Sequence, residues 1–132
     1  MISAVRMFSN NFTSAQNQQR QEMINQRYNE IYSHELAHQR AGGSLAGGIV
    51  IERDANGIPT GGHVPIKMPA LDKNNPEKTI KDANTVISSA MAPSDPSDQD
   101  YRVANQARSI KSQAEAYKKA HPEVGQKLDV RG

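Results

Sequence analysis

A long stretch without glycine or proline constrains the fold of this chain more than any other feature. It runs from Ala15 to Ala41 and carries a stripe of side chains spaced three and four residues apart: Ile24, Tyr28, Ile31, Glu35 and His38. This spacing places the stripe on one face of an α-helix, which has 3.6 residues per turn. The sequence therefore predicts one long amphipathic helix, ended by Gly42 and Gly43, where a left-handed residue can cap it.

A small β-hairpin is expected after this helix. Residues 48–53 contain the β-branched run Ile49-Val50-Ile51 and lead into the turn residues 54–57, so residues 58–68 should return as the partner strand. Pro59 and Pro65 have no backbone N–H to donate to a ladder. The second strand should therefore be irregular and lie at a sheet edge.

Two further helices follow from their capping residues. Asn75-Pro76-Glu77 supplies a cap, a first-turn proline and an acid, which predicts a helix that ends before Pro93. Residues 97–100 resemble a capping box and predict a third helix that ends before Pro122. The expected fold class is α+β: a long helix, a small hairpin and two further helices, in a minimal zincin-like arrangement.

Composition limits the size of the core. Leu, Ile, Val and Phe together make up about 17% of the 132 residues, a low share for a globular chain, although the net charge is only +2. We therefore expect a single domain with a thin core at residues 16–121. A flexible arm at residues 1–15 and a flexible tail at residues 122–132 should flank it.

Composition and charge also exclude several classes of protein. No apolar run is long enough to span a membrane, and the N-terminus lacks the apolar core of a secretory signal. Lys and Arg (16) nearly balance Asp and Glu (14), so there is no basic stripe for nucleic acid. The absence of cysteine suits the cytoplasm, which is the expected location, although export without a cleaved signal is not excluded. The oligomeric state is left open.

The motif that carries chemistry is His34-Glu35-Leu36-Ala37-His38, an HExxH sequence inside the long helix. A random chain of this composition would contain about 0.006 copies of it. The i, i+4 spacing places both imidazoles on one helix face, where they can bind a single Zn²⁺. Glu35 lies beside that face and can act as general base toward a metal-activated water. The alternative is a pair of solvated histidines with no metal.

A catalytic zinc site normally takes a third protein ligand. Ala41 and Ser44 stand where the extended metzincin motif requires Gly and His, so that subclass is excluded. We favour His63 as the third ligand, because Gly61 and Gly62 before it let a strand pass close to another element. Acidic alternatives are Glu52 and Asp72, and His63 could also be a plain surface residue.

Several motifs together are similar to those of a known family. The runs SHELAHQRAGG, DANG, GGHV, NPEKTI and MAPSDPSDQDYRVANQA occur in this order over roughly residues 30–110. They resemble a bacterial family known as SprA-related, described as zinc metalloproteases. The resemblance implies a zinc-binding hydrolase. In that family the position of His63 is often Glu, which is also a zinc ligand, and a nearby Asp is replaced here by Lys67.

The sequence thus predicts a zinc-dependent metallopeptidase that acts on a peptide or protein substrate. Its cofactor would be Zn²⁺, bound by His34, His38 and His63, with Glu35 as the general base. Two alternatives use the same residues differently: a non-catalytic binding module stabilised by zinc, and a zinc amidase that acts on cell-wall peptides.

Overall fold

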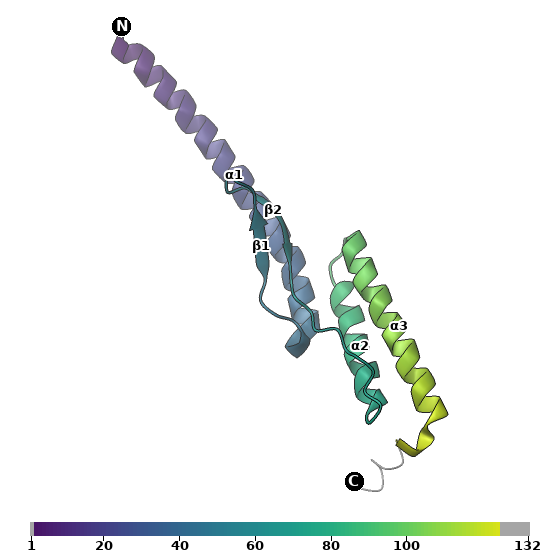
Figure 1. Cartoon of the computed structure of the whole chain (residues 1–132). Coiled ribbons are helices and arrows are strands. Elements are labelled where there is room, and N and C mark those ends of the chain that lie inside the picture. The colour runs from purple at the N-terminus through teal and green to yellow at the C-terminus, as the bar shows by residue number, and fades with distance from the viewer. Residues whose placement is uncertain (1, 125–132) are drawn as a thin grey trace.

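The computed structural model describes the backbone of residues 2–124 and the side chains of residues 13–124. Its elements, in chain order, are helix α1 (Ile2–Gly42), the short 3-10 helix η1 (Gly43–Leu45), strands β1 (Val50–Arg53) and β2 (Pro59–His63), and helices α2 (Pro76–Ala90) and α3 (Asp98–Ala120). The hairpin lies along the C-terminal half of α1, and α2 and α3 form an antiparallel pair beside it (Figure 1). The α+β class is therefore confirmed.

Helix α1 begins earlier than the sequence pattern predicts. It starts at Ile2 instead of near Ala15, because residues 2–14 also lack glycine and proline and contain nothing that would stop a helix. The side chains of residues 1–12 and all of residues 125–132 lie outside the described part. The flexible arm and the flexible tail therefore stay predictions.

The predicted helix ends are confirmed by their capping contacts. Gly43 has a φ of +53°, the left-handed conformation that ends α1. The Asn75 side chain accepts the backbone N–H of Lys78 at the start of α2. Ser97 and Asp100 exchange both bonds of a capping box at the start of α3. The 3-10 turn η1, which the sequence pattern did not predict, follows directly on the end of α1.

The hairpin is antiparallel and irregular, as its prolines predict. Val50 pairs with His63, and the register shifts between Glu52 and Arg53, opposite the start of β2. Strand β2 is shorter than the predicted residues 58–68, because the chain leaves the ladder after His63 and returns only as an isolated bridge between Ala46 and Ile66. The turn is tightened by Gly57, whose φ is +79°.

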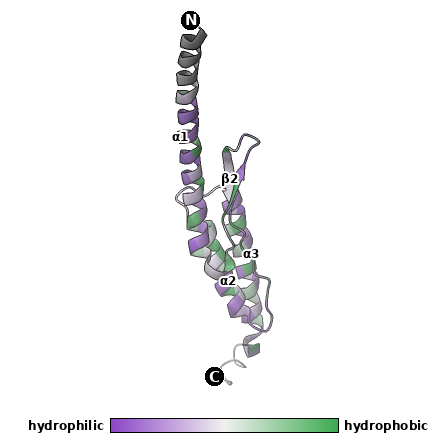
Figure 2. Cartoon of the chain, turned by 90° about the vertical axis from the view of Figure 1, so that its left-hand side faces the viewer, coloured by the Kyte–Doolittle hydropathy of each residue, from purple (hydrophilic) through white to green (hydrophobic). Residues whose placement is uncertain are grey.

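The core is thin and built from small side chains. Most of it lies between α2 and α3, and its buried hydrophobic members among the described residues are Ala83, Val86, Ala90, Ala104, Ala107 and Ala114. The described part of α1 is mostly hydrophilic, whereas α2 carries more hydrophobic residues (Figure 2). Helix α1 packs against α2 and β2 but nowhere brings its Cα atoms within 8 Å of those of α3. None of the described helices combines the length and the hydropathy that crossing a bilayer requires.

Candidate metal centre

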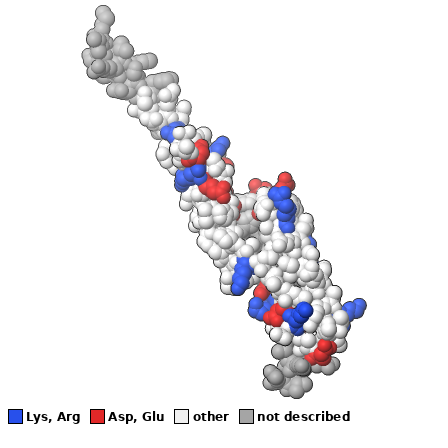
Figure 3. Space-filling view, viewed as in Figure 1, with Lys and Arg blue, Asp and Glu red and all other residues white. Residues whose placement is uncertain are grey.

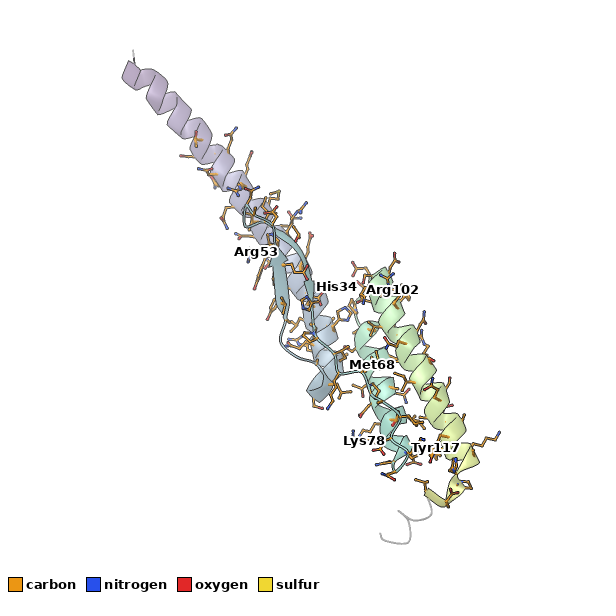
Figure 4. The ribbon with its side chains drawn as sticks, in the orientation of Figure 1. His34, Arg53, Met68, Lys78, Arg102 and Tyr117 are labelled. Atoms are coloured by element: carbon orange, nitrogen blue, oxygen red, sulfur yellow. The ribbon has the colours of Figure 1, made fainter. Side chains whose placement is uncertain are left out.

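The two histidines of the HExxH sequence come together near the C-terminal end of α1. Their Nε2 atoms lie 3.2 Å apart. One ligand atom each from His34, Glu35 and His38 falls within 4.8 Å of the others, so the three side chains form a cluster that could hold a metal ion. Figure 4 places His34 on the side of α1 that faces the N-terminal end of α3, where Arg102 is labelled.

Each imidazole is held through its other ring nitrogen. His38 Nδ1 lies 2.6 Å from the backbone carbonyl oxygen of Ser89 in α2. A carbonyl oxygen only accepts, so Nδ1 of His38 carries the proton and donates it. His34 Nδ1 lies 3.3 Å from Oδ1 of Asp95. Metal-binding histidines typically show this arrangement, in which an oxygen acceptor at one nitrogen orients the other nitrogen toward the metal.

A carboxylate that the sequence analysis did not single out faces both imidazoles. Asp100, in the first turn of α3, places Oδ2 3.1 Å from Nε2 of His34 and Oδ1 3.1 Å from Nε2 of His38. Its side chain is 15% exposed. The backbone N–H of Ser97 donates to Oδ2 at 2.8 Å, which fixes the carboxylate in place.

The sequence does contain a signal for Asp100. A capping box normally carries Glu or Gln at this position, and the shorter Asp is a departure from that preference. Asp100 is also the last acid of the segment MAPSDPSDQD, which carries part of the family resemblance. Helix capping accounts for an acid at this position, so a second role of Asp100 at the histidine pair does not follow from these local signals.

Glu35 lies close to the histidines but is not held by them. It is 6% exposed, and within the described residues its carboxylate makes no hydrogen bond or ion pair. Burial raises the pKa of the Glu35 carboxyl above its ordinary value, and the nearby rings of His38 and His34 oppose that rise. Glu35 is therefore a largely buried residue whose carboxylate oxygens have no partner among the described residues and remain accessible to water.

A glycine brings strand β2 against Glu35. A Cβ atom at Gly62 would lie 2.8 Å from Cγ2 of Ile31 and 3.0 Å from Cγ of Glu35. Only a residue without a side chain lets the strand approach α1 this closely. The predicted role of the paired glycines is confirmed for Gly62.

His63 faces the same cleft but lies outside the cluster of His34, Glu35 and His38. Its Nδ1 lies 2.9 Å from Oε1 of Glu52, and its side chain is 54% exposed. The bond to Glu52 leaves Nε2 as the nitrogen available to a ligand. The assignment of His63 as a metal ligand stays a prediction.

Neither acidic alternative, Glu52 or Asp72, lines the cleft, and the fourth histidine, His121, also lies elsewhere. Asp72 accepts the backbone N–H groups of Asn74 and Asn75 in the loop before α2, and it does not line the cleft. His121 ends α3, where its ring stacks on Tyr117 and its Nδ1 lies 3.1 Å from Oε1 of Glu123. The structure therefore does not bring either residue to the histidine pair.

The cleft has room for a substrate group beside the cluster. Its volume is about 400 Å³, and it is bounded by α1, β2 and the facing ends of α2 and α3. Its titratable lining residues are His34, Glu35, His38, His63 and Asp100. Acidic and basic side chains are mixed over the face shown in Figure 3, which has no continuous basic stripe.

The donor set fits a metal cation. Nε2 of His38 carries a lone pair when the ring is neutral, because its proton is on Nδ1, and this lone pair faces a carboxylate oxygen of Asp100. His34 has carboxylate oxygens near both of its nitrogens but only one proton to donate when neutral. The cluster thus presents more acceptors than donors, a surplus that a cation would satisfy.

These features define an α+β protein with a histidine–carboxylate cluster on a long helix, facing a cleft. The sequence model of the SprA-related family matches residues 4–129. The match spans nearly the whole chain, and the chain belongs to the SprA-related family. No curated protein and no solved structure matches it. The family match by itself names no metal and no reaction.

Proposed function

We propose that this protein is a zinc-dependent metallopeptidase of a minimal zincin-like type, with His34 and His38 as metal ligands and Glu35 as the general base. The HExxH spacing, the oriented imidazoles and the surplus of acceptors all support a metal at this position. The third ligand comes from a side chain that faces the cleft, His63 or Asp100. When bound, zinc polarises a carbonyl group and lowers the pKa of water toward about 7.

The observation that carries this proposal is the state of Glu35. A general base needs a carboxylate close to the reacting water and free to exchange a proton. Glu35 lies within 4.8 Å of the imidazole nitrogens, is almost fully buried, and has no hydrogen-bond or ion-pair partner among the described residues. No buried side-chain oxygen among the described residues lacks a partner, so the unpaired oxygens of Glu35 are accessible to water from the cleft. Glu35 can therefore accept a proton from the attacking water and pass it to the leaving amine.

Strand β2 is the proposed docking site for the substrate. The described sheet has two strands, β1 and β2, so β2 has one edge without a partner strand. Gly62, His63 and Val64 line the cleft that also contains Glu35. An extended peptide that adds to this edge by β-augmentation would pass in front of the histidine pair.

The two alternatives keep the metal and change the outcome. In a zinc-stabilised binding module, the metal supplements the thin core and no bond is cleaved. In a zinc amidase, the same chemistry acts on cell-wall peptides. The unpaired carboxylate of Glu35 supports an enzyme over the binding module.

Substitution Glu35→Gln tests the proposal, because it removes the base and keeps the size of the side chain. Zinc content should stay near that of the wild type, whereas hydrolysis of a peptide library should fall by about 10²–10⁴-fold. The library should contain linear peptides and cell-wall peptides, so that a peptidase and an amidase give different products. Glu22→Gln, at an exposed position of the same helix, is the matched control and should leave hydrolysis unchanged.

Three results would contradict the proposal in different ways. Wild-type protein that binds no zinc removes the metal site altogether. Wild-type protein that holds zinc firmly and cleaves neither class of peptide supports the binding module. Loss of zinc from the Glu35→Gln variant would make Glu35 a structural or ligating residue and not the base.

A further inference from the structure

We infer that Asp100 is the third protein ligand of the metal, which is thus bound by His34, His38 and Asp100. This inference rests on the metal site of the proposed function and deepens it. It differs from the sequence-based prediction, in which His63 takes the third position. It also assigns α3 a part in the site, although the backbone of α3 does not approach α1.

The distances among the three side chains suit one shared ion. The two Nε2 atoms lie 3.2 Å apart; that of His34 lies 3.1 Å from Oδ2 of Asp100, and that of His38 lies 3.1 Å from Oδ1. Ligand atoms placed tetrahedrally at 2.0–2.1 Å from a zinc ion are separated by about 3.3 Å. The two nitrogens therefore stand close to the spacing of two corners of a zinc site, and the carboxylate of Asp100 faces both of them.

The orientation of His38 agrees with a ligand role. Its Nδ1 donates to the backbone carbonyl oxygen of Ser89, so Nε2 is the nitrogen that it presents to Asp100 and to the cleft. A hydrogen bond at the other ring nitrogen is typical of histidines that bind a metal.

The surroundings of Asp100 are those of a ligand held in place. Its carboxylate is fixed by the backbone N–H of Ser97 at 2.8 Å, and its side chain is 15% exposed. Supporting hydrogen bonds of this kind orient carboxylate ligands. The side chain of His63, in contrast, is 54% exposed, and its Nδ1 lies 2.9 Å from Oε1 of Glu52. His63 is thus free to face a substrate in the cleft.

Metal affinity of single variants tests the inference, with Zn²⁺ measured by competition against a chromophoric chelator. Asp100→Asn should weaken zinc binding by more than about 100-fold, beyond the 10–100-fold typical of residues that only support a ligand. Asp98→Asn removes the same charge from the same helix turn at an exposed position and should change affinity less than about 3-fold. His63→Gln should change affinity less than about 10-fold.

Two further measurements keep the test valid if Asp100→Asn folds poorly. Asp100→His replaces one zinc ligand by another and should recover most of the affinity that Asp100→Asn loses. In wild-type protein, cobalt substitution followed by crystallography at the metal edge should place an oxygen of Asp100 within about 2.0–2.2 Å of the ion. Circular dichroism of each metal-free variant separates loss of a ligand from loss of the fold.

The outcomes distinguish this inference from the proposed function. The inference is overturned if the wild type binds zinc, Asp100→Asn binds it equally well and His63→Gln loses it. That result leaves the metallopeptidase proposal intact. Wild-type protein that binds no zinc overturns both. Loss of zinc in Asp100→Asn but not in Asp98→Asn or His63→Gln supports Asp100 as the third ligand.

Discussion

Replacement of Gly62 by alanine should loosen the contact between strand β2 and helix α1 on which the site depends. The added Cβ atom would lie 2.8 Å from Cγ2 of Ile31, 2.9 Å from the backbone oxygen of Val50 and 3.0 Å from Cγ of Glu35. The Val50 oxygen belongs to the paired strand and cannot turn aside as a side chain can. The strand must therefore move, and Glu35 moves with it or is compressed.

The size of the effect follows from this crowding. Forcing one extra methyl group into a packed site costs about 1–3 kcal/mol. In a domain of this size that corresponds to a fall in melting temperature of about 5–15 °C. We expect thermal unfolding of Gly62→Ala, followed by circular dichroism, to show this fall, together with weaker zinc binding.

Gly61 provides the matched control one residue earlier. A Cβ atom there would meet only Oε2 of Glu52, at 3.8 Å, and neither glycine has a positive φ. Gly61→Ala should therefore leave the melting temperature unchanged or raise it slightly, because alanine reduces the freedom of the unfolded chain. Equal melting temperatures for the two variants would refute the close approach of β2 to α1 and the position of Glu35 derived from it.

Three further predictions concern stability. Zinc at a free concentration of 100 times its dissociation constant would stabilise the folded protein by about 2.7 kcal/mol. Removing that zinc with a chelator should therefore lower the melting temperature by about 5–15 °C. An unchanged melting curve after verified metal removal contradicts this prediction. Burial raises the pKa of Glu35 in the folded protein above its ordinary 4.5, so the metal-free protein should lose stability as the pH rises from the ordinary pKa to the raised one. Thermal melts between pH 4 and 8 should show a smaller loss for Glu35→Gln than for the wild type. Parallel curves would argue against the raised pKa. Ser89→Ala removes the buried hydroxyl that donates to the His38 carbonyl at 2.7 Å and should lower the free energy of unfolding by about 1 kcal/mol in urea titration, whereas Ser88→Ala, at an exposed position, should not.

Local sequence signals account for most of the fold. Capping residues and turn glycines act on the backbone within a few residues, so Gly43, Asn75 and the Ser97–Asp100 pair could be assigned without knowledge of the tertiary structure. The HExxH spacing fixes the two imidazoles on one helix face for the same local reason. Helix α1 starts at Ile2 and not near Ala15, because residues 2–14 also contain no glycine or proline that would end a helix.

The position of Asp100 could not be obtained in this way. It lies 66 residues from His34 along the chain, and their contact depends on how the α2–α3 pair stands beside α1. Small side chains such as Ala83 and Ala107 set the packing of that pair, and sequence periodicity does not specify its angle. Asp100 both caps helix α3 and contacts the two histidines of α1. The pattern of neighbouring residues indicates only the first of these two roles.

The two carboxylates at the histidine pair have opposite surroundings, and this difference supports a division of roles. Asp100 is fixed by the Ser97 N–H and faces both Nε2 atoms, so it is held in one position, as a ligand must be. Glu35 is more deeply buried, has no fixed partner among the described residues, and has a raised pKa, so it can gain and lose a proton during a reaction. A site that only stabilised the fold would have no need of the second kind of carboxylate. The unpaired Glu35 beside the well-ordered side chains of His34, His38 and Asp100 is therefore the strongest structural argument for the proposal of hydrolysis over that of metal-stabilised binding.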